Sequence, residues 1–257
     1  MRGEIAGNIT QTFYDHLASQ YDKLFLDWQA AVREQAVILD RLFRENGFDP
    51  SNRVLDCACG IGTQAIGLAA LGYHVTASDI SGGELAEAKK RAAENHVEIP
   101  FVIADFCALS ETFDEPFDIV IAMDNALPHM LSGEALESAV KSIVNQIVEG
   151  GMFVASIRDY DALLLNKPPY SPPYIHQTEK GQRVSFQTWK WECERYRLIQ
   201  YIIEDENALQ VSKFACEYRA TRREELANLL LANGCREVKW LFPEETSFYQ
   251  PIVVAKK

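Results

Sequence analysis

The sequence predicts an α/β fold, a doubly wound and mostly parallel sheet with an antiparallel β insertion after the fifth strand. Through the first 160 residues, short apolar runs alternate with amphipathic stretches of helical spacing, which is typical of a parallel sheet covered by helices on both faces. A glycine-rich turn separates the first run from the helix that follows it. After residue 166, long runs rich in β-branched and aromatic residues replace this alternation and indicate antiparallel strands.

The first 48 residues predict two helices that precede the sheet. Apolar residues recur at helical spacing through residues 10–47, with a break near Asp27 and Trp28, and the pattern ends at Asn46 and Gly47. We expect residues 1–48 to cover the ligand site of the domain that follows.

Five predicted strands and three predicted helices make up the main part of the sheet. The strands are expected at residues 53–57, 75–79, 101–104, 117–123 and 151–157, and the helices at 63–71, 83–95 and 133–148. Because each strand is separated from the next by a helix or a long connection, the pattern predicts parallel pairing.

The insertion is expected at residues 167–218. It begins with a proline-rich loop at 167–174 and continues with three predicted strands at 182–193, 196–204 and 210–218. A helix at 222–233, capped by Thr221 and closed by Gly234, then precedes final strands at 237–241 and 252–255. We therefore expect residues 49–166 and 219–257 to form one α/β domain, with 167–218 as its cap.

Composition excludes several classes of partner. The 25 Lys and Arg against 37 Asp and Glu give a net charge of −12, without a basic run that could neutralise phosphates or anionic lipids. No apolar stretch is long enough to span a bilayer, and the polar opening residues lack a signal-peptide core. We expect a cytoplasmic protein with a small-molecule substrate, and no nucleic-acid or membrane partner; the oligomeric state stays open.

The six cysteines predict neither disulfides nor a metal site. They lie mostly in strand-like runs of a long chain, where reduced and buried thiols are the common state. Cys57 and Cys59 have no second Cys/His pair at metal-ligand spacing nearby.

The turn after the first strand is the strongest functional signal. Asp56 ends that strand, and Gly60 and Gly62 follow in the turn. Asp79 ends the next strand, where a carboxylate can accept both hydroxyls of a ribose. Ligands of open parallel sheets bind at this edge, so the spacing predicts a nucleoside pocket.

Two cofactor classes fit this spacing. The run Gly60 to Ala65 matches the G-x-G-x-x-A fingerprint of dinucleotide binding, which keeps an NAD-binding oxidoreductase open as an alternative. A carboxylate at Asp56 disfavours a pyrophosphate but suits a ligand with sulfonium and ammonium groups, and S-adenosylmethionine carries both without phosphate. A non-catalytic nucleoside-binding protein is a further alternative.

The order of motifs between residues 50 and 160 resembles the class I S-adenosylmethionine-dependent methyltransferases. The turn reads D-x-A-C-G-x-G, with Ala58 in place of the usual first glycine, and is similar to the glycine and sarcosine N-methyltransferase branch. The resemblance implies a Rossmann-like methyltransferase sheet and S-adenosylmethionine as cofactor. It implies these cofactor contacts: Tyr21, Trp28, Asp56, Ala58, Gly60, Gly62, Asp79, Ile80, Asp105, Phe106, Met123 and Asn125.

The same resemblance suggests the substrate end of the site. Residues 156–161 are similar to the H-R-N-Y-D segment of that branch, in which the arginine holds a substrate carboxylate through its planar fork. We take His129, Arg158 and Tyr160 as catalytic candidates, with His129 placed to orient or deprotonate a nucleophile. A packed loop histidine and a surface ion pair are the structural alternatives for His129 and Arg158. The expected reaction is N-methylation of an amino acid or related carboxylated amine, and methylation of oxygen or carbon in another small molecule is the alternative.

Overall fold

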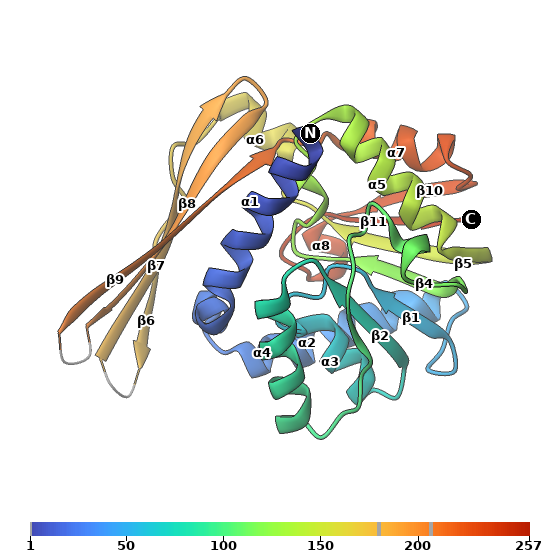
Figure 1. The fold of residues 1–257 in the computed structure, drawn as a ribbon, viewed down its shortest axis with the longest axis horizontal. Coiled ribbons are helices and arrows are strands. Elements are labelled where there is room, and N and C mark those ends of the chain that lie inside the picture. Colours follow the sequence, from blue (N-terminus) through green and yellow to red (C-terminus); the bar gives the residue numbers. More distant parts are fainter. Residues whose placement is uncertain (1, 179–180, 206–207) are drawn as a thin grey trace.

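The computed structural model describes residues 2–178, 181–205 and 208–257, which form two sheets with helices packed around them (Figure 1). The larger sheet has seven strands in the order β10-β11-β5-β4-β1-β2-β3. Its strands are β1 (Arg53–Asp56), β2 (His74–Asp79), β3 (Phe101–Ile103), β4 (Phe117–Ala122), β5 (Ile147–Ser156), β10 (Glu237–Leu241) and β11 (Ile252–Lys256). The first five strands pair in parallel, and β11 runs antiparallel to both of its neighbours. The predicted doubly wound sheet is confirmed.

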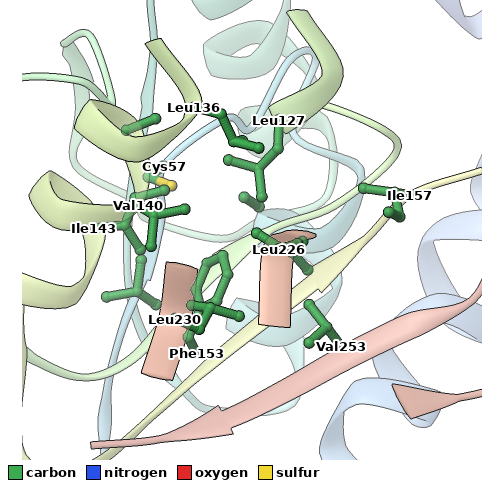
Figure 2. Close-up of a cluster of buried hydrophobic side chains, with 14 of the residues drawn as sticks. Cys57, Leu127, Leu136, Val140, Ile143, Phe153, Ile157, Leu226, Leu230 and Val253 are labelled. Carbon is green, nitrogen blue, oxygen red and sulfur yellow. The ribbon is translucent and has the colours of Figure 1, made fainter. Parts of the chain in front are cut away.

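Helices cover both faces of this sheet. They are α1 (Arg2–Leu17), α2 (Trp28–Glu45), α3 (Thr63–Ala70), α4 (Gly82–Glu94), α5 (Gly133–Asn145), α6 (Tyr160–Asn166), α7 (Arg223–Ala232) and α8 (Pro243–Thr246). Short 3-10 turns are η1 (Ala18–Leu24), η2 (Leu109–Glu111) and η3 (Leu127–His129). Successive side chains of a strand point to opposite faces, so Phe153 packs with α5 and α7 while Val154 packs with α2 and α3. Figure 2 shows the first of these cores, in which Leu226 and Leu230 lie beside Phe153.

The insertion is a four-stranded antiparallel sheet in the order β6-β7-β8-β9. Its strands are β6 (Tyr174–Thr178), β7 (Gly181–Glu192), β8 (Arg195–Asp205) and β9 (Leu209–Arg219). It projects beyond the α/β core, and α1 lies between the two sheets (Figure 1). On its inner face Tyr196 and Leu198 are buried in the same core cluster as Phe153. The insertion is therefore packed onto the main sheet through a shared core.

Several element boundaries differ from the sequence prediction. Strand β5 begins at Ile147, ahead of the Gly150-Gly151 pair, so the predicted helix at 133–148 ends earlier, at Asn145. A Cβ at Gly151 would lie 2.7 Å from the carbonyl oxygen of Asp118. Glycine is therefore required at this position because the neighbouring strand packs closely, and not because the chain turns there. The structure also adds β6, α6 and α8, which were not predicted. Arg222, not Thr221, is the N-cap of α7.

Within these described ranges, no helix is long and apolar enough to cross a membrane, and no cluster of three or more potential metal-ligating side chains occurs.

Candidate functional site

The turn after β1 is shaped by two glycines and one carboxylate. Gly60 and Gly62 have φ values of +52° and +89°, in the left-handed region that L side chains rarely adopt, and Gly62 caps the N-terminus of α3. The Gly60 amide donates a hydrogen bond to Oδ2 of Asp79, with a nitrogen–oxygen distance of 2.9 Å. This bond fixes the turn against the end of β2. The glycine turn and Asp79, which are separate in the sequence, therefore lie in one site.

A cavity of about 340 Å³ lies over the carboxyl ends of β1 to β4. It is lined by nine of the residues that the sequence predicted for the site: Tyr21, Ala58, Gly60, Asp79, Ile80, Asp105, Phe106, Met123 and His129. Three carboxylates line it, those of Asp79, Asp105 and Asp124, and none of the lining residues among those described is a lysine or arginine. The cavity is therefore electrostatically suited to a cation and unsuited to a phosphate.

Asp56 lies beneath the cavity and does not line it. Its carboxylate is fully buried; Oδ1 accepts a 3.4 Å hydrogen bond from the Ala58 amide, and Oδ2 has no hydrogen-bond partner. Burial raises the pKa of Asp56 well above its ordinary value, and the nearby charge of Asp79 adds to this effect. Asp56 thus holds the turn from below, and a cation bound above the turn would favour its ionised form.

Asp79 and Asp105, the predicted ribose and adenine contacts, both line the cavity. Asp79 Oδ1 accepts a hydrogen bond from the Ser81 amide at 2.9 Å, and burial raises the pKa of its carboxyl. Asp105 Oδ1 accepts the Cys107 amide at 2.8 Å. Each carboxylate oxygen that accepts one protein hydrogen bond keeps further acceptor capacity for a ligand hydroxyl or amino group.

Glu84 was missed by the sequence analysis although it adjoins the turn. Its carboxylate is buried without any hydrogen-bond partner, and a Cβ at Gly60 would lie 3.2 Å from its Oε2. Burial raises the pKa of Glu84 well above its usual range, with Asp79 adding to the shift. No sequence motif identified Glu84. It is the third residue of α4, and acidic residues are common in the first turn of a helix.

An uncharged aromatic wall closes the opposite side of the cavity. The Tyr14 hydroxyl lies 2.8 Å from Nε2 of His129 and 3.4 Å from the Tyr218 hydroxyl, and the ring centroids of His129 and Tyr218 are 4.2 Å apart. Burial lowers the pKa of His129 to about 3, so its imidazole is neutral at physiological pH. Tyr14 and Tyr218 are far from His129 in sequence, and only the packing of α1 and β9 identifies them.

Arg158 and Tyr160 lie behind this wall and outside the lining. Arg158 donates to the Tyr196 hydroxyl at 2.8 Å and to Gln187 at 3.0 Å, and its guanidinium lies 5.4 Å from the ring centroid of Tyr218. Among the described residues it forms no ion pair. The Tyr160 hydroxyl is fully buried and donates to Oδ1 of Asn125 at 3.0 Å. Both residues are one aromatic layer away from the cavity.

The remaining predicted residues support the site without lining it. Trp28 donates from its indole nitrogen to the Thr63 hydroxyl at 3.0 Å and so joins α2 to the first residue of α3. Gly62 lies in the turn and Asn125 behind the end of β4.

Comparison with known proteins agrees with this geometry. Residues 54–151 match a methyltransferase domain family. The chain is 31% identical to glycine N-methyltransferase of Rattus norvegicus over 174 residues, which cover 63% of this chain and 58% of that protein. The chain thus spans little more than half the length of this relative.

Solved structures of low sequence identity share the whole fold. A crystal structure of an S-adenosylmethionine-dependent methyltransferase from Clostridium acetobutylicum has a TM-score of 0.73 at 17% identity, covering 95% of this chain and 97% of that one. A sugar N-methyltransferase from Streptoalloteichus has a TM-score of 0.72 at 17% identity, covering 88% and 87%. Residues 54–151 thus resemble a methyltransferase domain, and the chain shares the fold of these S-adenosylmethionine-dependent methyltransferase structures.

Proposed function

We propose that this chain transfers a methyl group from S-adenosylmethionine to the nitrogen of a small amine, an amino acid or a related carboxylated amine. The observation that carries the proposal is the cavity over β1 to β4, whose described lining presents three carboxylates and no lysine or arginine. That charge suits a phosphate-free cationic cofactor and argues against a dinucleotide, whose pyrophosphate would meet the carboxylates.

The residues present fit this cofactor. Asp79 would accept the ribose hydroxyls, and Asp105 with Phe106 would contact the adenine, in line with the resemblance of the motifs. The left-handed turn at Gly60 and Gly62 would let the backbone approach the ligand closely. The carboxyl of Asp56, whose Oδ2 has no hydrogen-bond partner among the described residues, lies beneath the turn and would ionise more readily beside a bound cation. S-adenosylmethionine, when bound, supplies an electrophilic methyl group.

The acceptor side of the cavity supplies alignment and a dry, uncharged surface. Methyl transfer is an in-line displacement whose barrier falls when nucleophile, methyl carbon and sulfur are held in a row. Tyr14 and His129 are fixed by the hydrogen bond between them and can hold the acceptor in line with the methyl carbon and the sulfur. Arg158, without a carboxylate partner in the described chain, offers a binding site for an acceptor carboxylate once the wall residue Tyr218 gives access.

Ligand binding tests the cofactor assignment. We expect S-adenosylhomocysteine to bind in calorimetric titration and NAD not to bind. Asp79→Asn should weaken S-adenosylhomocysteine binding by about tenfold to a hundredfold, because hydrogen bonds to a charged acceptor contribute about 1.5–3 kcal/mol. The control is Asp114→Asn, which removes the same charge from an exposed position. Binding of NAD in place of S-adenosylhomocysteine would refute the proposal.

A single-turnover panel tests the acceptor. We expect methyl transfer to glycine and sarcosine to exceed transfer to an amino sugar, which lacks a carboxylate, and to phenols. Arg158→Ala should raise the KM for the carboxylated amines selectively. Equal transfer to phenols, or no effect of Arg158→Ala, would favour the oxygen or carbon acceptors instead.

A further inference from the structure

Of the three carboxylates that line the cavity, Asp124 is the one that the proposed cofactor contacts leave without a role. It lies two residues after β4 and lines the cavity together with His129, whereas Asp79 ends β2 and Asp105 lies two residues after β3. Its backbone is strained: Asp124 has a φ of +56° and Asn125 a φ of +70°. Two successive non-glycine residues in the left-handed region cost about 1–2 kcal/mol each, and such strain is concentrated at functional sites.

Neutral donors hold the carboxylate of Asp124 in place. Oδ1 accepts a hydrogen bond from the Tyr249 hydroxyl at 2.7 Å, and Oδ2 accepts one from the Gln64 side-chain amide at 2.8 Å. The Asp124 amide donates to the Ser156 hydroxyl at 2.8 Å. Among the described residues no cation pairs with this carboxylate, and it is only partly exposed. The chain thus holds this carboxyl rigidly, and because burial raises its pKa, its ionised form is a strong base that a bound cation would favour.

The residues that line the cavity together with Asp124 make a cation the matching ligand. His129 is neutral because burial lowers its pKa to about 3, and the phenols of Tyr14 and Tyr21 remain protonated because burial raises their pKa values. Asp56 beneath the turn is a second buried carboxyl whose ionised form a bound cation would favour. An ammonium held at Asp124 would therefore face an anion on one side and aromatic rings on the other, and rings also stabilise cations.

We propose that Asp124 binds the protonated amino group of the acceptor and accepts its proton before methyl transfer. The inference rests on the proposed N-methyltransferase function. The ammonium R–NH₃⁺ passes one proton to the carboxylate, and the freed nitrogen lone pair forms the bond to the methyl carbon. The electron pair of the broken carbon–sulfur bond stays on sulfur, and the product leaves as R–NH₂⁺–CH₃. Asp124 then returns its proton to solvent.

Asp124→Asn is the direct test. It removes the charge and keeps the shape, and the side-chain amides of Gln64 and Gln35 can rotate to restore complementary hydrogen bonds to the new amide. We expect the affinity for S-adenosylhomocysteine to stay within about threefold of the wild type, because hydrogen bonding of the nucleoside is untouched. With glycine as acceptor, kcat/KM at pH 7 should fall by at least about tenfold. The loss should shrink toward pH 9, where free amine forms without a base.

The control variants separate charge from folding. Asp124→Gly suits the positive φ and should reproduce the kinetic loss if Asp124→Asn folds poorly. Asp114→Asn should leave all parameters unchanged.

Each other outcome counts against the inference. A parallel loss of S-adenosylhomocysteine affinity, with the pH profile for glycine unchanged, would assign Asp124 to the amino group of the cofactor. Wild-type kinetics in both Asp124 variants would remove its role altogether. A wild-type protein that binds S-adenosylhomocysteine but methylates phenols and no amine would instead refute the proposed function, and the inference with it.

Discussion

The neutral state of His129 couples one residue to the stability of the fold. In the folded chain burial lowers its pKa from the ordinary 6.5 to about 3, so below pH 6.5 the unfolded chain binds a proton that the folded chain does not. The contribution of neutral His129 to the free energy of unfolding is fully present above pH 6.5 and is lost as the pH falls toward 3. Between pH 7 and pH 5 the loss is about 2 kcal/mol.

His129→Gln should remove this part of the pH dependence. We expect urea unfolding of the variant to lose about 2 kcal/mol less stability than the wild type between pH 7 and pH 5, whatever its stability at pH 7. His74→Gln, at an exposed position, is the matched control and should keep the wild-type slope. If the free energy of unfolding of the variant kept the wild-type dependence on pH, the pKa of His129 would not be lowered in the folded chain.

Individual site residues were predictable where sequence spacing alone carries the chemistry. Gly60 and Asp79 follow from a strand-end rule, and the 2.9 Å bond between them shows why the spacing works. Tyr14 and Asp124 were missed as site residues because their roles depend on α1 packing against β9 and on a left-handed backbone, which no periodicity encodes. Arg158 was predicted from a motif, but its distance from the cavity depends on Tyr218.

At the scale of elements, the packing of α3 on α2 depends on Gly67. A Cβ at this position would lie 2.5 Å from the carbonyl oxygen of Val32 and 2.7 Å from the Cβ of Ala36. Helix propensity alone predicts that Gly67→Ala stabilises α3 by about 1 kcal/mol. Because overpacking a tight contact costs about 1–3 kcal/mol, we expect the variant to be less stable and its melting temperature to fall.

Gly133→Ala provides the contrasting element-scale control. An added Cβ at this first residue of α5 would meet only Glu225 Oε1, at 3.9 Å, so we expect unchanged or slightly higher stability by thermal unfolding. If both variants were stabilised alike, α2 and α3 would have to be further apart than the structure places them.

Element type was more predictable than element boundaries. Hydrophobic periodicity gave the parallel strands and their helices, because each element buries one regular face. It failed at Ile147, where a strand starts directly after a helix, and at Tyr174, where prolines precede an edge strand. In both places tertiary pairing with a neighbouring strand outweighs the local signal.

At the scale of the whole molecule, the site is assembled by long-range packing that the sequence order hides. Tyr14 reaches Tyr218 across 204 positions, and the insertion contributes Tyr196 to the core of the main sheet. The fold class could be predicted because alternation of strands and helices is a property of the entire chain. The closure of the cavity could not, because it depends on where α1 and β9 meet.

The net charge of −12 has a local counterpart in the acids at and beneath the cavity, and this gives a prediction for the whole molecule. Burial raises the pKa values of Asp56, Asp79, Glu84 and Asp124, so the ligand-free chain retains protons that exposed carboxyls would lose. A bound cation favours the charged forms of these acids and lowers their pKa values. Binding of S-adenosylmethionine should therefore release protons, and its affinity should rise as the pH increases through the range where these acids titrate. Calorimetric titration in two buffers of different ionisation enthalpy measures the number released. S-adenosylhomocysteine lacks the sulfonium charge and should release fewer protons, so equal, buffer-independent heats for both ligands would show that the acids are already ionised in the free protein.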